Sequence, residues 1–170
     1  MRISSLFFLV CFLLSACTGS EKNKEPFANC KYGQPIAIFN SALPGLASHQ
    51  FDLEMTTSTE ILQFKDGLEL TLVQSGCDDR IQEFQFKLMG NYQDQPNEFW
   101  IEQTLDLLQK LGRLGPDYQV FNAWAEALDL QGDQIRLAQS TEVQPGFFVR
   151  IDKILSQDHA ILLLILSEKP

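Results

Sequence analysis

Four segments in the first half of the chain alternate apolar and polar residues, and this alternation constrains the fold more than any other feature. Successive side chains of a β-strand point to opposite faces, so a period of two is typical of a strand with one buried and one wet face. The apolar positions are Phe51, Leu53 and Met55; Leu62 and Phe64; Leu68, Leu70 and Leu72; and Phe84, Phe86 and Leu88. The pattern predicts an antiparallel meander of about four strands.

Turn signals separate these strands from one another and from a short run before them. Lys65-Asp66-Gly67 predicts a tight hairpin, because Asp-Gly readily adopts the positive φ angles of such turns. Ser75 to Asp79 predicts the next reversal, and Leu43-Pro44-Gly45 predicts a turn before the meander. Upstream of that turn, the apolar run Ile36 to Phe39 predicts a short strand.

Two helices are predicted after the meander. Asp94-Gln95-Pro96 has the composition of a helix start, and Leu114-Gly115-Pro116 that of its end. A second helix is predicted from Asp117 to Gly132. At 100° per residue, each has one apolar side that would pack on a core. The apolar positions are Trp100, Ile101, Leu105, Leu107, Leu108 and Leu111 in the first helix, and Val120, Trp124, Ala127 and Leu128 in the second.

The C-terminal part predicts a strand pair, Phe147 to Ile151 and Ala160 to Leu166. The second run is apolar at every position, and its seven residues are too few to cross a membrane, so it predicts a central strand covered on both faces. The expected fold class is α+β: an antiparallel sheet, made of the meander and the C-terminal pair, with two helices packed on one face. Residues 29–170 are expected to form this single domain.

The N-terminus carries a different kind of signal. Met1-Arg2 precedes an apolar run from Leu6 to Leu14, which is too short for a membrane-spanning helix and typical of a secretory signal. The following Leu14-Ser15-Ala16-Cys17 resembles the lipobox of bacterial lipoproteins. That resemblance implies a signal peptide over residues 1–16, cleavage before Cys17 and a lipid on its sulfur. An ordinary secretory signal or an uncleaved anchor is the alternative interpretation.

If the lipobox interpretation holds, the protein is attached to a membrane by its lipid. Residues 17–28 would be the lipidated N-terminus and a tether with no apolar pattern. Thr18, rather than Asp, follows the cysteine, which resembles lipoproteins of the outer membrane. The expected location is therefore the cell envelope, on the outer membrane and facing the periplasm.

The cysteines fit such an oxidising compartment. Cys11 would leave with the signal and Cys17 would carry the lipid, so Cys30 and Cys77 remain as a pair. A disulfide between them is the simplest outcome. Two buried free thiols are an alternative, and so is a redox or metal site, although the wide spacing and the lack of nearby ligands disfavour the latter.

Charge narrows the choice of partners. The formal net charge of the chain is −9, and removing the signal takes away only Arg2, which leaves −10. Such a domain repels nucleic acid and would attract a cationic protein. The candidate contacts are Asp78 and Asp79 in a predicted turn, and Phe99 near the polar side of the first helix. Carboxylates close together in the sequence can bind a hard cation, and Asp78, Asp79 and Glu83 form such a group. They lack the spacing of a calcium-binding loop, so no metal is predicted.

Candidate catalytic groups are scarce. The only histidines are His49 and His159, and no nucleophile elbow, zinc-binding helix or phosphate loop occurs. The sequence therefore predicts no cofactor and no enzyme, but a non-enzymatic binding or inhibitor-type module of unknown partner. Two alternatives stay open: a structural subunit of an envelope assembly, which would expose a large apolar patch, and an enzyme with an unrecognised carboxylate site.

Overall fold

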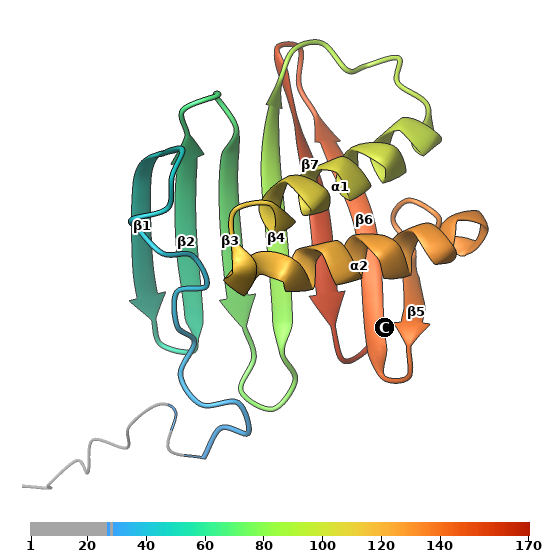
Figure 1. The fold of residues 1–170 in the computed structure, drawn as a ribbon. Helices are drawn as coiled ribbons and strands as arrows, with labels where there is room; N and C mark the ends of the chain where they lie inside the picture. Colours follow the sequence, from blue (N-terminus) through green and yellow to red (C-terminus); the bar gives the residue numbers. More distant parts are fainter. Residues whose placement is uncertain (1–26, 28) are drawn as a thin grey trace, which may run out of the picture.

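In the computed structural model, residue 27 and residues 29–170 form one seven-stranded sheet with two α-helices on it (Figure 1). Only these residues are described below. The strands are β1 (Leu46–Glu54), β2 (Thr57–Phe64), β3 (Glu69–Ser75), β4 (Ile81–Met89), β5 (Ser140–Gln144), β6 (Phe147–Leu155) and β7 (His159–Ser167). All neighbouring strands are antiparallel, in the order β1-β2-β3-β4-β7-β6-β5. The predicted α+β class, the four-strand meander and the C-terminal pair are confirmed, whereas β5 was not predicted.

The chain builds this sheet from two meanders. The first meander, β1 to β4, is followed in the chain by the two helices. The second begins at the opposite edge of the sheet with β5 and continues through β6 to β7 in the interior. The two join where β7 pairs with β4, from Ile81↔Ser167 to Met89↔His159. The apolar C-terminal run is therefore an interior strand, as its composition predicts.

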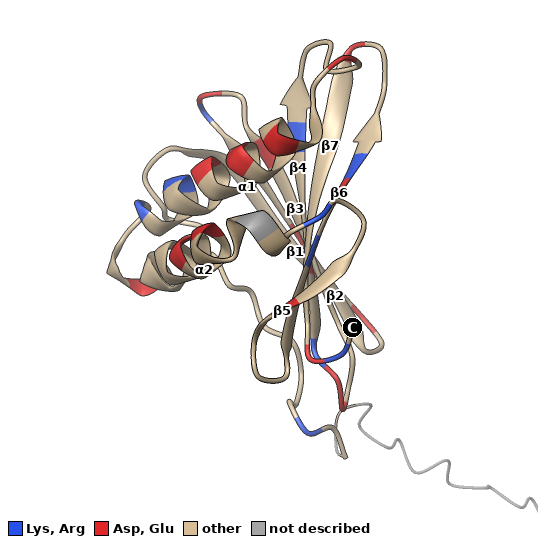
Figure 2. Ribbon diagram, turned by 90° about the vertical axis from the view of Figure 1, so that its right-hand side faces the viewer, with Lys and Arg blue, Asp and Glu red and all other residues tan. Residues whose placement is uncertain are grey.

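Helices α1 (Asn97–Gly112) and α2 (Gln119–Leu130) cover the same face of the sheet, which Figure 2 shows from the side. The short 3₁₀ turn Pro116–Tyr118 connects them, and another, Gly132–Gln134, follows α2. The two helices approach closely at Gly112, where an added Cβ would lie 2.1 Å from the Asn122 side-chain oxygen. A glycine at this position lets the helices meet.

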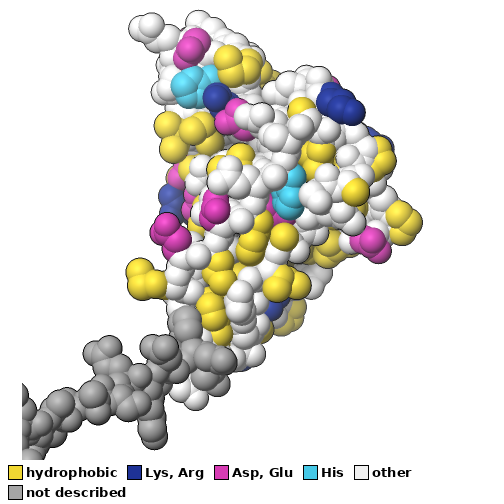
Figure 3. Space-filling view, turned by 90° about the vertical axis from the view of Figure 1, so that its left-hand side faces the viewer, with side chains coloured by type: hydrophobic (Ala, Val, Ile, Leu, Met, Phe, Trp, Pro, Cys, Tyr) yellow, Lys and Arg dark blue, Asp and Glu magenta, His cyan; other side chains and the backbone are white. Residues whose placement is uncertain are grey.

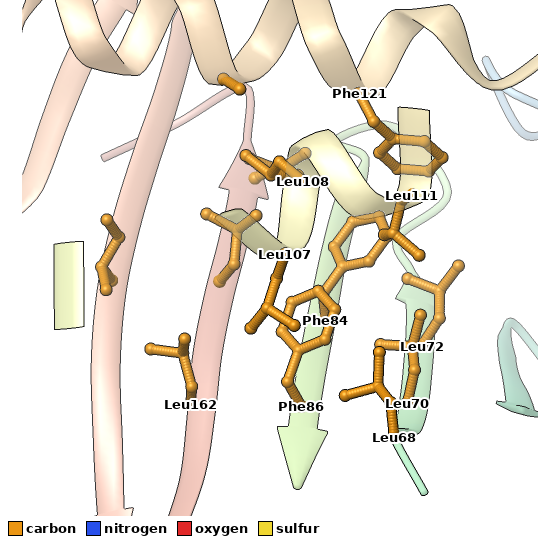
Figure 4. Close-up of a cluster of buried hydrophobic side chains, with 14 of the residues drawn as sticks. Leu68, Leu70, Leu72, Phe84, Phe86, Leu107, Leu108, Leu111, Phe121 and Leu162 are labelled. Carbon is orange, nitrogen blue, oxygen red and sulfur yellow. The ribbon is translucent and has the colours of Figure 1, made fainter. Parts of the chain in front are cut away.

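The core lies between the helices and the sheet (Figure 4). Phe84 and Phe86 of β4 are fully buried there, and the Phe84 ring meets Phe121 and Trp124 of α2 edge-on at 5.8 and 6.1 Å. Full burial of one such side chain contributes about 1.5–3 kcal/mol. From α1, the buried apolar side chains are Trp100, Leu107, Leu108 and Leu111.

Three local predictions before β2 and in α2 are wrong. Residues 36–39 form no strand, because the backbone N–H groups of Ile38 and Phe39 donate to the Glu60 carboxylate and not to a neighbouring strand. Met55 lies in the turn after β1 with a φ of 48° and is 82% exposed. On the side of the molecule that β1 forms, hydrophobic side chains reach the surface among polar ones (Figure 3). In α2, Val120 is exposed and Phe121 is buried, because the side of the helix that faces the core carries Phe121, Ala125 and Leu128.

The prediction that the C-terminal run is covered on both faces is also wrong. Along β7, buried residues alternate with half-buried ones. Leu162 and Leu164 face the helices, but Ile161, Leu163 and Ile165 point to the other face. In the part of the chain that the structure describes, no helix packs on that face (Figure 2). One face of an antiparallel sheet is commonly left to solvent. Here that face includes an apolar strand.

Candidate functional site

The helix-free face of the sheet, called the open face below, has an apolar column along its middle. The column consists of Ile161, Leu163 and Ile165 on β7, which are half-buried. Their cross-strand neighbours on β6 include Ile154, which is 52% exposed, and the same face of β6 carries Phe148. A strand facing water would alternate apolar and polar residues, so this column is unusual for a solvated surface.

Acidic side chains surround this column. The strand register places six carboxylates on the open face: Asp52, Glu54, Glu69, Glu83, Glu142 and Asp152. The same strands place two cations there, and each is paired: Lys87 Nζ lies 3.4 Å from Glu69, and Arg150 Nη2 lies 2.6 Å from Asp152. The other four carboxylates have no cationic partner among the described residues. The open face is therefore a negatively charged frame around an apolar centre.

A hollow of about 240 Å³ lies at one end of this face, where β3, β4 and β7 contribute Glu69, Lys87 and His159 to its lining. The ring Nδ1 of His159 lies 2.8 Å from the Asp158 carboxylate, and this hydrogen bond lowers the pKa of Asp158. Both side chains reach solvent, with 28% of His159 and 80% of Asp158 exposed. The pair fixes the imidazole orientation at the surface.

The disulfide between Cys30 and Cys77 is present, which confirms the predicted pairing. It attaches the segment before β1, residues 29–45, to the turn between β3 and β4. This segment is called the strap below. The Gln74 amide reinforces the attachment by donating to the Ile36 carbonyl at 2.8 Å. The other predicted features of the N-terminus, namely Cys17, the signal segment 1–16 and nearly all of the tether 17–28, lie outside the described residues.

The three candidate partner contacts lie in two separate places. Asp78 is exposed in the turn after β3, and Asp79 in the same turn pairs with Lys169. Phe99 lies at the start of α1 and is half-buried, with its ring 5.8 Å from Tyr92 and 5.2 Å from Trp100. Phe99 therefore packs the loop before α1 onto the helix. The structure does not bring the aspartates and Phe99 together, and their contact roles stay predictions.

Sequence reasoning missed a buried acid, Glu60 on β2. Its side chain is fully buried, and its two oxygens accept hydrogen bonds from the Ile38 and Phe39 N–H groups at 2.9 Å each. His49 Nε2 lies 2.7 Å from the same carboxylate. A signal was available, since Glu60 occupies the buried phase of the alternation that continues to Leu62 and Phe64. The carboxylate holds the strap against the sheet.

Two kinds of feature are absent from residues 27 and 29–170. No three or more histidine, cysteine, aspartate or glutamate side chains gather there in a way that would hold a metal ion. In the same part of the chain, neither helix is long and apolar enough to cross a membrane.

Comparisons of the chain with protein families, with curated proteins and with solved structures give no match.

Proposed function

We propose that the protein is a lipid-anchored lipoprotein of the cell envelope, on the outer membrane facing the periplasm, whose domain binds a cationic protein through the open face. The observation that carries the proposal is the apolar column of Ile161, Leu163 and Ile165 on an interior strand. The composition of β7 suits burial on both sides, and the described domain covers one. A partner would cover the other.

Charge supports the choice of a cationic partner. Four carboxylates of the open face, Asp52, Glu54, Glu83 and Glu142, have no cation beside them in the described structure. Interfaces place complementary charges around a less charged centre, and the surrounding charges mainly raise the association rate. A partner with lysine or arginine around an apolar patch would match this surface.

The tether is compatible with binding at this face. Thr18 to Pro26 is nine residues, which can span at most about 30 Å. The strap is fixed at the turn between β3 and β4, at one end of the sheet. A domain attached by that end presents its two sheet faces sideways. The open face would then be accessible to a second envelope protein.

Site-specific crosslinking in the native envelope tests the interface. A photoreactive residue at Leu163 should crosslink to a basic protein, and a matched one at Glu102, an exposed position on α1, should not. The yield at Leu163 should fall as salt rises, because screening shortens the reach of charges to about 8 Å at physiological ionic strength. Equal adducts at both positions, or none at Leu163, would rule out the open face as the binding surface.

The anchor needs its own test. Cys17→Ser should abolish lipid labelling and release the domain or leave the precursor uncleaved, whereas Cys30→Ser should keep the lipid. Mass spectrometry of the wild-type N-terminus measures the modification directly. An unmodified mature N-terminus would contradict the lipoprotein assignment and leave the open-face binding proposal standing.

A further inference from the structure

A second apolar feature, separate from the open face, is a pocket between α2 and the hairpin of β5 and β6. Its volume is about 210 Å³, and it is called the Trp124 pocket below. Its lining residues are Trp124, Ala127, Leu128, Val143, Gln144, Phe147, Val149 and Leu166. The side chains thus come from α2, from the edge hairpin and from β7, which enclose the pocket from different directions.

Two local features keep this pocket from closing. Ala127 presents only a methyl group at a helix position between the larger Trp124 and Leu128. On the opposite side, the pairing of β5 with β6 shifts register between Glu142 and Gln144, where Val143 is the extra residue of a bulge. Bulges redirect side chains and often occur beside binding sites.

The chemistry of the lining specifies the kind of molecule that fits. None of the lining side chains is charged, and Gln144, which is exposed, is the single one with a polar amide. The Trp124 and Phe147 rings lie 6.3 Å apart between centroids and are tilted by 35°. A protein cavity of about 150 Å³ binds benzene. The Trp124 pocket therefore has room for one aromatic ring and a few further atoms.

We propose that the Trp124 pocket binds a small, uncharged apolar molecule that has one ring and a short side chain carrying a hydroxyl or carbonyl group. The ring would lie between α2 and the hairpin, against Trp124 and Phe147. The polar group would sit at the mouth and hydrogen-bond to the Gln144 amide. An ion would bind poorly, because the lining offers no charge to replace its hydration. This site is independent of the open face.

The experiment uses two probes of nearly equal shape, 2-phenylethanol and ethylbenzene, with affinity measured by titration calorimetry or by NMR shifts of the Trp124 indole. Ala127→Phe places a ring inside the pocket, whereas Ala123→Phe makes the same change on the exposed side of α2. We expect Ala127→Phe to weaken both probes at least tenfold and Ala123→Phe to change neither by more than twofold. Far-ultraviolet circular dichroism and thermal melting check that both variants fold.

Gln144→Leu tests the polar end of the site. The variant should shift the ratio of the two dissociation constants at least threefold in favour of ethylbenzene, because the hydroxyl loses its partner. If the wild type binds neither probe, or if Ala127→Phe and Ala123→Phe bind as the wild type does, the pocket is not a ligand site. An unchanged ratio in Gln144→Leu would overturn the assignment of the polar group.

Discussion

The two halves of the sheet are buried in different ways. Across β4, β7 and β6, the helices supply apolar side chains, and Phe84, Leu162 and Ile151 are fully buried. Across β2 and β3, the strap covers polar side chains on the same face, namely Ser58, Glu60 and Gln74. The first half is held by packing. The second contributes Leu62, Leu70 and Leu72 to the same apolar core, and the strap adds hydrogen bonds and a disulfide.

This difference affects how each half resists perturbation. Apolar burial is not directional, so a packed half loses stability in proportion to the volume removed. A polar contact is directional, and removing one partner leaves the others unsatisfied in a dry site. Phe39 belongs to both halves, since it lies in the strap and its ring stacks on Tyr118 and Phe121 at 5.5 and 5.7 Å. The variants below separate the two kinds of stabilisation.

The largest effect is expected in the helix-covered half. Phe84→Ala should lower the free energy of unfolding by about 3–5 kcal/mol, because the cavity would lie in the core among the rings of Phe86, Phe121 and Trp124. Phe148→Ala removes the same side chain from the open face and should cost about 1 kcal/mol. Chemical denaturation measures both. Similar losses in the two variants would mean that the open face is as well packed as the core.

Elements with a strong local pattern were predictable from the sequence. The strands of the first meander alternate over several residues, and Asp66-Gly67 forms the expected turn with a Gly67 φ of 92°. Strand β5 was missed because its alternation rests on Thr141 and Val143 alone and is interrupted by the bulge. Its place at the edge is set by pairing with β6, which a local pattern does not encode.

Features that depend on distant contacts were not predictable. The run from Ile36 to Phe39 has the composition of a strand. Its last two backbone N–H groups, however, donate to the carboxylate of Glu60, which lies more than twenty residues away in the sequence. The apolar run of β7 indicated two covered faces, because composition shows that a strand suits burial but not what buries it. From the sequence, both faces of β7 are therefore predicted to be covered, including the one that the structure leaves open. The disulfide was predictable because elimination left a single pair of cysteines.

The next largest effect concerns the disulfide. Replacing Cys30 and Cys77 by serine together should lower the free energy of unfolding by about 2–4 kcal/mol, since the bridge closes a loop with a sequence separation of 47. Hydrogen exchange of the β4 and β7 amides should rise only by the factor that this loss of global stability sets, whereas the strap amides should rise by more, because the strap then opens locally. If exchange rises equally throughout the sheet, the strap does not behave as a separate unit.

A smaller effect is expected for the buried acid. Glu60→Gln keeps the shape but replaces one acceptor oxygen by an NH₂ donor that faces N–H groups, so it should cost about 1–3 kcal/mol. The amides of Ile38 and Phe39 should exchange faster in the variant. Glu54→Gln, at an exposed position on β1, is the matched control and should change neither quantity. Unchanged exchange at residues 38 and 39 would show that the carboxylate does not hold the strap.

The smallest effect concerns the ion pair between Asp66, in the turn of β2 and β3, and Lys110 of α1, which joins the two halves. Lys110 Nζ lies 2.6 Å from the Asp66 carboxylate, and this hydrogen bond, with a second one from the Leu68 N–H, lowers the pKa of Asp66 below its ordinary value of 3.8. Because the pKa of Asp66 is lower in the folded state, its ionised carboxylate stabilises the protein above pH 3.8. This stabilisation is lost as the pH falls through the pKa of the folded state. Because the Asp66 side chain is 55% exposed, solvent screens the pair, and Asp66→Asn should cost only about 0.2–1 kcal/mol at neutral pH.

The pH dependence distinguishes this pair from general surface charge. The stability difference between the wild type and Asp66→Asn should shrink as the pH drops below 3.8 and should also shrink in high salt. Asp129→Asn removes an exposed carboxylate of α2 that has no ion-pair partner among the described residues, so it should show no such acid-dependent difference. Denaturation at several pH values measures both variants. A constant difference for Asp66→Asn down to pH 2 would mean that the variant is destabilised by an altered turn at Leu68 and not by the loss of a charge. The two halves would then be joined by their shared apolar core alone.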